Sequence, residues 1–199
     1  MRCGRLSVRD ALGWEPEQAV NAARWVLLIY SLPARPSRKR AFVWRELKKL
    51  GAVYLRDGVA VLPAGAQALA AFRTIAVRVE DFEGQATVVD SAELDRARGD
   101  EIVSESRAAR ASEYADILNE AQQLWDYMQR ESSHRDFTPV ELDQLTSDLN
   151  KLRRWREQVA ARDYFASGAH ERLRDVLSQF EAALTNIRSS ASPGTVAAR

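Results

Sequence analysis

Short apolar runs alternate with helical patterns between Trp25 and Asp90, and this order constrains the fold more than any other feature of the sequence. The run Trp25–Tyr30 is entirely apolar or aromatic and has the length of a buried strand. Two further runs, Ala52–Leu55 and Val59–Leu62, flank an Asp-Gly pair, which is a strong signal for a β-hairpin. A fourth strand is predicted at Gln85–Asp90.

Two amphipathic helices are predicted between these strands. The segment Ser37–Leu50 follows a turn bracketed by prolines, and Ser37 stands where a helix-capping residue is expected. The Ala-rich segment Ala66–Val79 carries Leu, Phe and Ile at helical spacing. With right-handed crossovers, this order predicts an α+β domain whose four-stranded antiparallel sheet is covered by two helices on one side, the ferredoxin-like βαββαβ arrangement.

The stretch around the first predicted helix is strongly basic. Residues 24–63 hold nine Arg and Lys side chains and two acidic ones, in a chain whose net charge is +1. Cations are unfavourable at the positive end of a helix dipole, so the cationic first turn Arg38–Arg40 is better tolerated when an anion binds there. Only Glu46 offers a partner within the helix, and Phe42 is expected to be exposed beside the arginines, which suits nucleic acid.

The predicted DNA-binding or oxyanion-binding residues belong to this basic stretch. They are Arg35, Ser37, Arg38, Lys39, Arg40, Arg45, Lys48, Lys49 and Arg56. A solvated basic surface that binds no ligand would have the same composition.

After Asp90 the sequence becomes helical and acidic. One long helix is expected at Glu93–Glu131, a second one after the capping box Thr138–Glu141, and a third one after Ser167-Gly168. Their apolar residues step by three and four, which indicates an antiparallel α-helical bundle or hairpin, although such stripes also form seams between two chains. A second basic cluster lies on the middle helix, at Lys151, Arg153, Arg154 and Arg156.

The predicted organisation has four parts. They are a partly disordered leader at residues 1–23, a ferredoxin-like domain at 24–91, a helical domain at 92–188 and a disordered tail at 189–199.

Several classes of protein are not indicated by this sequence. No apolar stretch approaches the ~20 residues that span a bilayer, and no secretory signal is present. The single cysteine, Cys3, agrees with a cytoplasmic location. Two separate histidines and one remote cysteine do not form a zinc site, and phosphate-binding loops and nucleophile elbows are missing. We therefore expect no enzymatic activity, no metal and no cofactor.

The run IYSLPARPSRKRAFVWRELKKLGAVYLRDGVAVLP, residues 29–63, closely resembles the N-terminal domain family of the chromate-resistance regulator ChrB. The later stretch ARDYFASG, residues 161–168, looks like the same family, so the resemblance covers roughly residues 25–187. More distantly, the sequence is similar to the middle domain of PaaX-type repressors and to the small ferredoxin-like nucleases of CRISPR adaptation. The resemblance implies a DNA-binding regulator of a chromate-efflux operon that responds to chromate.

The sequence departs from these relatives in three places. The nucleases have an Asp at the end of the first strand, where this chain reads Tyr30-Ser31-Leu32, so metal-dependent cleavage is not expected. PaaX-type repressors resemble winged-helix proteins at their start, and the residues before the first strand are too few for that. ChrB-type regulators usually carry a further C-terminal domain, so we expect a truncated or stand-alone version of their N-terminal half.

The sequence leaves three functions open. The first is a homodimeric DNA-binding regulator whose basic stretch contacts phosphates. The second is a sensor of a tetrahedral oxyanion, such as chromate or sulfate, held by the helix start beside Ser37, Arg38 and Arg40. The third is an assembly module without nucleic acid or bound ion, in which the basic stretch and the acidic helices attract each other.

Overall fold

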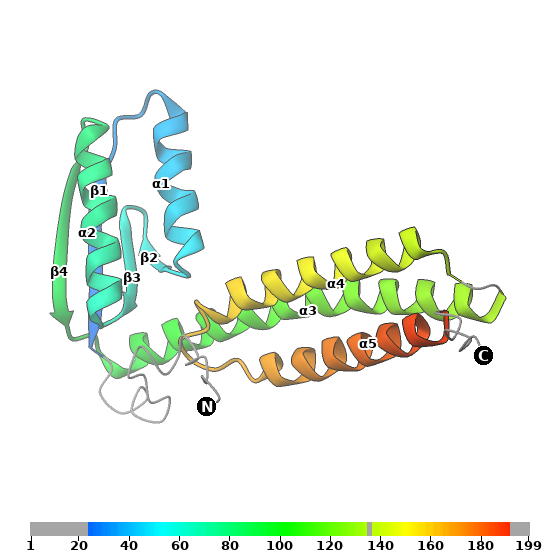
Figure 1. Ribbon diagram of the computed structural model, residues 1–199. Helices are drawn as coiled ribbons and strands as arrows, with labels where there is room; N and C mark the ends of the chain where they lie inside the picture. Colours follow the sequence, from blue (N-terminus) through cyan, green and yellow to red (C-terminus); the bar gives the residue numbers. More distant parts are fainter. Residues whose placement is uncertain (1–23, 135–136, 192–199) are drawn as a thin grey trace, which may run out of the picture. The chain divides into compact units, whose positions relative to one another are not determined.

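The computed structural model describes residues 24–134 and 137–191 (Figure 1). The described chain forms two compact units. The first comprises residues 24–108 together with residues 161–165, and the second comprises the remaining described residues. The predicted leader at 1–23 lies outside the described residues.

The first unit contains a four-stranded antiparallel sheet and two interleaved helices. The strands are β1 (Trp25–Ser31), β2 (Val53–Arg56), β3 (Val59–Pro63) and β4 (Gln85–Ala92), and the helices are α1 (Ser37–Lys49) and α2 (Ala66–Asp81). The strands lie in the order β2-β3-β1-β4, so β1 and β3 are central. The predicted succession of strands and helices is confirmed, and so is the α+β class.

Gly58 makes the turn between β2 and β3 possible. Its φ of +74° favours glycine, and a Cβ at this position would lie 2.4 Å from the carbonyl oxygen of Tyr30. The Tyr30 N–H in turn donates a hydrogen bond of 2.7 Å to the Gly58 carbonyl. The predicted Asp-Gly hairpin is confirmed, and its tip is fitted closely against β1.

Residues of β1 point alternately to the two faces of the sheet. Val26 and Leu28 are fully buried on the face covered by the helices, in a core with Val43, Leu47, Phe72, Ile75 and Val79. Trp25 faces the other side, where a smaller core contains Val61, Ile102 and Phe165. Because both faces are covered, the strand is apolar at nearly every position.

The ARDYFASG stretch contributes to this second face. The Phe165 and Trp25 rings have centroids 5.9 Å apart, and the Phe165 carbonyl accepts a hydrogen bond of 2.9 Å from Arg107 Nε. The Tyr164 hydroxyl donates a hydrogen bond of 3.0 Å to the Leu50 carbonyl, at the end of α1. Its residues 161–165 therefore hold both the central strand and the end of α1.

The second unit consists of three long helices that lie side by side (Figure 1). They are the remainder of α3 (Arg96–His134), α4 (Pro139–Ala160) and α5 (Ala169–Ala191), and consecutive helices run in opposite directions. All three contribute to one core that includes Tyr114, Ile117, Met128, Leu145, Leu149, Leu173, Leu177 and Phe180. Helix α5 continues through Ser189 to Ala191, into the stretch that was expected to be a tail.

The predicted capping box at the start of α4 is confirmed. The Thr138 N–H donates to Glu141 Oε2 at 2.9 Å, and the Glu141 N–H donates to Thr138 Oγ1 at 3.3 Å. Each residue thus supplies an acceptor for a backbone donor of the other at the first turn of the helix.

Replacing Phe165 with Ala is expected to lower the free energy of unfolding by about 3–5 kcal/mol, because a buried ring is removed from the core around Trp25. Replacing Tyr164 with Phe should cost only about 0.5–1.5 kcal/mol, because one hydrogen bond is lost. Urea denaturation followed by circular dichroism measures both. Equal losses for the two variants would contradict the assignment of Phe165 to the core.

Candidate functional site

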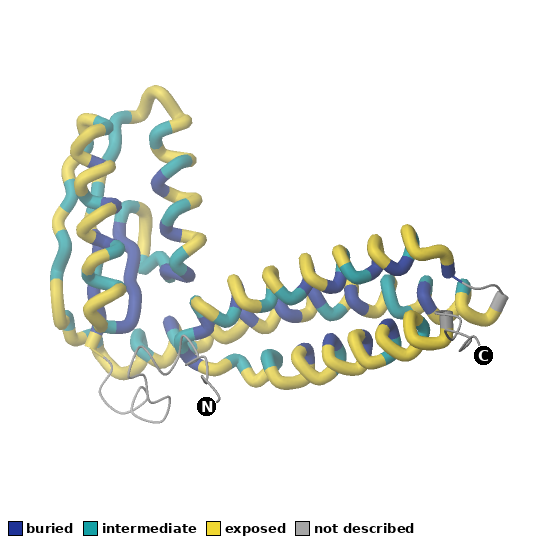
Figure 2. Tube along the Cα trace, in the orientation of Figure 1, coloured by how far each residue is buried: buried dark blue, intermediate teal, exposed yellow. Residues whose placement is uncertain are grey.

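Helix α1 carries most of the predicted binding residues. Val43 and Leu47 bury its inner side against the sheet, and its outer side is exposed (Figure 2). Pro36, with φ −78° and ψ 145°, occupies the capping position, and no side chain caps the helix. The prediction that Ser37 caps the helix is wrong, because the extended backbone at Pro36 makes Ser37 the first helical residue.

Six predicted binding residues are exposed cations that have no carboxylate partner among the described residues. No acidic side chain of residues 24–134 and 137–191 lies within ion-pair distance of any of them. They are Arg35, Arg38, Arg40, Arg45, Lys48 and Arg56. The four that α1 carries, Arg38, Arg40, Arg45 and Lys48, are called the α1 cationic surface below. Among the described residues, Arg45 donates to the Ala41 carbonyl within the helix at 3.1 Å.

Lys39 is engaged inside the first unit. Its side chain is only 20% exposed, and its Nζ donates to the Phe82 carbonyl at 3.2 Å and to Glu83 Oε2 at 3.0 Å. The Nζ atom also lies 5.8 Å from the centroid of the Phe82 ring, within the range of a cation–π interaction. Lys39 therefore joins α1 to the end of α2.

The exposed aromatic residue of α1 is Trp44. The expectation of an exposed Phe42 is wrong, because Phe42 packs edge to face on Phe82 with ring centroids 5.6 Å apart. Trp44 lies on the other side of the buried stripe and is 51% exposed, with Lys48 Nζ 5.8 Å from the centroid of its ring. The sequence signal that identifies this feature is the spacing of four residues in Arg40, Trp44 and Lys48.

Lys49 pairs with Glu46 within the helix, with Nζ 2.7 Å from Oε1. An exposed pair at this spacing contributes about 0.3–0.5 kcal/mol and is screened by salt. The pair therefore leaves Lys49 within reach of an anion.

Two tyrosine hydroxyls form a pair on the helix-covered face of the sheet. Tyr30 Oη and Tyr54 Oη lie 3.1 Å apart. Burial and then this hydrogen bond raise the pKa of Tyr54 above its ordinary value, so its phenol stays neutral at physiological pH. The pair supplies a hydrogen bond between the side chains of β1 and β2.

The second predicted basic cluster is largely engaged in the helical unit. Lys151 pairs with a carboxylate one turn earlier at 2.7 Å, and Arg153 pairs with Glu181 of α5. The Arg156 side chain is mostly buried and its Nε has no hydrogen-bond partner among the described residues. Arg154 alone of the four is exposed without an ion pair in the described chain. Among the described residues, only Arg153 pairs with another helix, whereas the carboxylate partners of Lys151 and Arg156 lie within α4.

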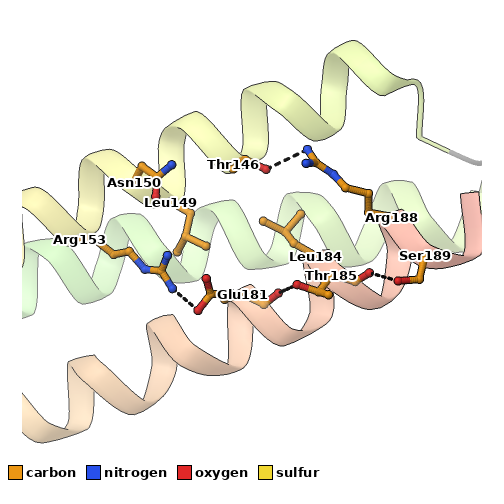
Figure 3. A pocket seen from close by; sticks show the side chains of 9 residues that line it. All are labelled: Thr146, Leu149, Asn150, Arg153, Glu181, Leu184, Thr185, Arg188 and Ser189. Atoms are coloured by element: carbon orange, nitrogen blue, oxygen red, sulfur yellow. Dashed lines mark hydrogen bonds and ion pairs between the residues drawn. The ribbon is translucent and has the colours of Figure 1, made fainter. Parts of the chain in front are cut away.

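A cavity of about 290 Å³ lies between α4 and α5. Figure 3 shows the side chains that line it. It contains two arginines, of which Arg153 pairs with Glu181 and Arg188 pairs with Asp143 at 2.8 Å. The hydrogen bond from Arg153 lowers the pKa of the Glu181 carboxyl, so this pair stays charged at neutral pH. Because each cation is already matched by a carboxylate, the cavity has no excess charge for an oxyanion.

Metal ligands and membrane segments are not found in the described chain. No group of three His, Cys, Asp or Glu side chains is placed there to hold a metal ion. None of the described helices combines the length and the apolar character needed to cross a bilayer.

Comparison of the sequence with known protein families finds a match to one family. The profile of the family described as "Protein ChrB, N-terminal" matches residues 40–190. Protein ChrB of Cupriavidus metallidurans (strain CH34) is 29% identical over 190 residues, which are 94% of this chain and 53% of that protein. The chain thus spans about half the length of this relative. No solved structure shows a significant match.

The contacts of Lys39 predict that it stabilises the fold, whereas its exposed neighbours do not. Lys39→Ala should lower the free energy of unfolding by about 1–2 kcal/mol, because a charged hydrogen bond to the Phe82 carbonyl is lost. Arg38→Ala and Arg40→Ala should stay within about 0.5 kcal/mol of the original chain. Urea titrations of the three variants test this, and a loss for Arg38→Ala as large as that for Lys39→Ala would contradict it.

Proposed function

The chain belongs to the family of the ChrB N-terminal domain, and on this premise we propose that it is a DNA-binding regulator of the ChrB type. One observation carries the proposal: the α1 cationic surface has no carboxylate partner in the described residues. Clustered, uncompensated Arg and Lys side chains are the electrostatic footprint of proteins that bind the phosphate backbone. The role is one of binding rather than catalysis.

The fold supports this use of α1. The strand order β2-β3-β1-β4 favours assigning the first unit to the ferredoxin-like arrangement. Both helices pack on one face of the sheet, so α1 keeps one side for packing and the other for solvent. The sheet fixes the helix through Val43 and Leu47, and the cations can therefore act as a rigid row.

The outer side of α1 can follow a phosphate strand. Arg38 and Arg45 lie seven residues apart on the same side of the helix, which corresponds to about 10 Å along its axis. That length is roughly the axial rise of three nucleotides in one strand of a duplex. Guanidinium groups make forked hydrogen bonds to phosphate oxygens, so both arginines suit this contact. Contacts of this kind position the protein and do not read base sequence.

We further propose that a small tetrahedral oxyanion, such as chromate or sulfate, competes with DNA at the start of α1. The first turn has no capping side chain and no acidic residue, and it carries Arg38 and Arg40 beside the Ser37 hydroxyl. Backbone amides at a helix start together with cations form a site for an anion. An oxyanion held there would occupy the position of a phosphate and weaken DNA binding, which links the regulator to an effector.

The alternative function is assembly through charge, without nucleic acid. It is supported by exposed acidic side chains of α3 for which no ion pair is found among the described residues, namely Asp116, Glu120 and Asp126. These carboxylates could bind the α1 cationic surface of a second copy within the proposed homodimer. In that case DNA and the second copy would compete for one surface.

Removing three cations of α1 should weaken DNA binding strongly. In gel shifts on DNA from upstream of the gene, the triple variant Arg38→Ala, Arg40→Ala and Arg45→Ala is expected to bind much more weakly at low salt. Each lost phosphate contact should reduce the slope of log affinity against log salt by roughly 0.9, so the slope should fall by roughly 2.7. A salt series from about 50 to 200 mM measures it.

The matched control removes the same charge from exposed positions elsewhere, through Arg73→Ala, Arg96→Ala and Arg172→Ala. The control should keep nearly the original affinity and slope. Equal losses in the two triple variants would show that net charge, and not α1, governs binding. Absence of DNA binding at low salt, together with salt-sensitive self-association in sedimentation, would favour the assembly alternative.

Oxyanion binding is tested by calorimetry with chromate and with sulfate as separate titrants. Heat is expected for at least one ion in the original chain and should be lost in the double variant Arg38→Ala and Arg40→Ala, because the cations beside the first turn are removed. Arg172→Ala is the control and should bind as the original chain does. No heat from either ion in a folded sample would rule the effector proposal out without affecting the DNA proposal.

A further inference from the structure

We propose that the indole of Trp44 is a stacking platform for an unpaired base, so that single-stranded or locally unpaired DNA is the preferred ligand of α1. This inference rests on the proposed function, because it specifies which form of DNA the α1 cationic surface binds.

Trp44 stands in the middle of a short stripe of exposed side chains. Arg40 precedes it and Lys48 follows it by one helical turn each, so the three side chains are neighbours on the outer surface of α1. Lys48 Nζ lies 5.8 Å from the centroid of the indole, which is the distance of a cation–π contact. The ring is therefore bordered by positive charge at both ends.

The fold does not use this ring. Trp44 belongs to none of the three hydrophobic cores of the described residues and is 51% exposed. The inner stripe of α1 is filled by Val43 and Leu47, and Phe42 occupies the contact with Phe82. No hydrogen bond joins the indole to the described chain. A large aromatic side chain that stays exposed on a cationic surface is available to bind a ligand.

The surroundings of Trp44 favour a nucleic-acid base over a protein partner. The cores of protein interfaces are depleted in charged residues, Lys among them, although Arg is enriched there. Trp44 has two cations along its stripe, Arg40 and Lys48. A cation, a ring and a second cation match a phosphate, a base and a second phosphate along one strand.

The ligand must present a free base. Inside a duplex, bases are stacked on both sides and paired at their edges, so a ring on a convex helix surface cannot reach them. An unpaired base has an open face on which an aromatic side chain can stack irrespective of sequence. The stripe therefore fits a single strand, or a duplex in which a base has left the stack.

The test compares the original chain with Trp44→Ala and Trp44→Phe by fluorescence anisotropy at low salt. The probes are a labelled single strand, the perfect duplex of the same sequence, and that duplex with one unpaired base. The control is Trp155→Ala, which removes a second exposed indole from α4. We expect Trp44→Ala to weaken single-strand binding by roughly 5- to 100-fold, in line with the loss of one stacked base.

The remaining variants separate the effect of stacking on affinity from the effect of charge. Trp44→Phe should recover most of the affinity, because it keeps an aromatic face, and Trp155→Ala should have no effect. Binding of all probes that is unchanged in Trp44→Ala, yet lost in the triple arginine variant, would overturn this inference and leave the proposed function intact. If no probe binds at low salt, both this inference and the proposed function are contradicted. A dimer that Trp44→Ala converts to monomer would assign the ring to a second copy instead, which also overturns the inference.

Discussion

Burial of β1 on both of its faces is the constraint on which the rest of the first unit depends. A central strand with apolar residues at nearly every position must be covered twice, and each fully buried side chain contributes about 1.5–3 kcal/mol. Helices α1 and α2 cover Val26 and Leu28 on one face. Ile102 of α3 and the returning Phe165 cover Trp25 on the other. One face of the sheet is thus covered in part by a segment that lies more than a hundred residues after β1 in the chain.

This packing also determines what α1 can offer to a ligand. The inner stripe of the helix packs on the sheet, Phe42 and Lys39 contact Phe82, and most of the other positions are exposed. Most of them are cations, and only Glu46 is an acidic residue of the helix. Like charges on one helix surface repel one another, and neighbouring carboxylates within the described chain do not relieve this repulsion except at Lys39 and Lys49. A bound polyanion would relieve it, which is the physical basis of the proposed function.

The local sequence pattern was sufficient to predict the helices and strands, whereas the roles of the site residues depend on tertiary contacts. The Asp-Gly hairpin and the Thr138 capping box were predictable because turn and cap chemistry involve only neighbouring residues. The engagement of Lys39 and the packing of Phe42 were not predictable, because both depend on Phe82, which follows the end of α2. Helical periodicity limits which side chains lie near the sheet, but it cannot tell which of the two flanks of a stripe meets a neighbouring element. Trp44 was missed for that reason.

Tertiary contacts also join the two stretches in which the sequence resembles the ChrB family. The ARDYFASG stretch and the run around α1 are far apart in sequence, yet they meet where the Tyr164 hydroxyl bonds to the Leu50 carbonyl. Residues at such a contact are constrained by packing and by hydrogen bonding, whether or not they touch a ligand. These contacts hold the end of α1, while the chemistry that α1 presents lies on its exposed side. There, the unpaired arginines and the open indole of Trp44 are the features that packing alone does not require.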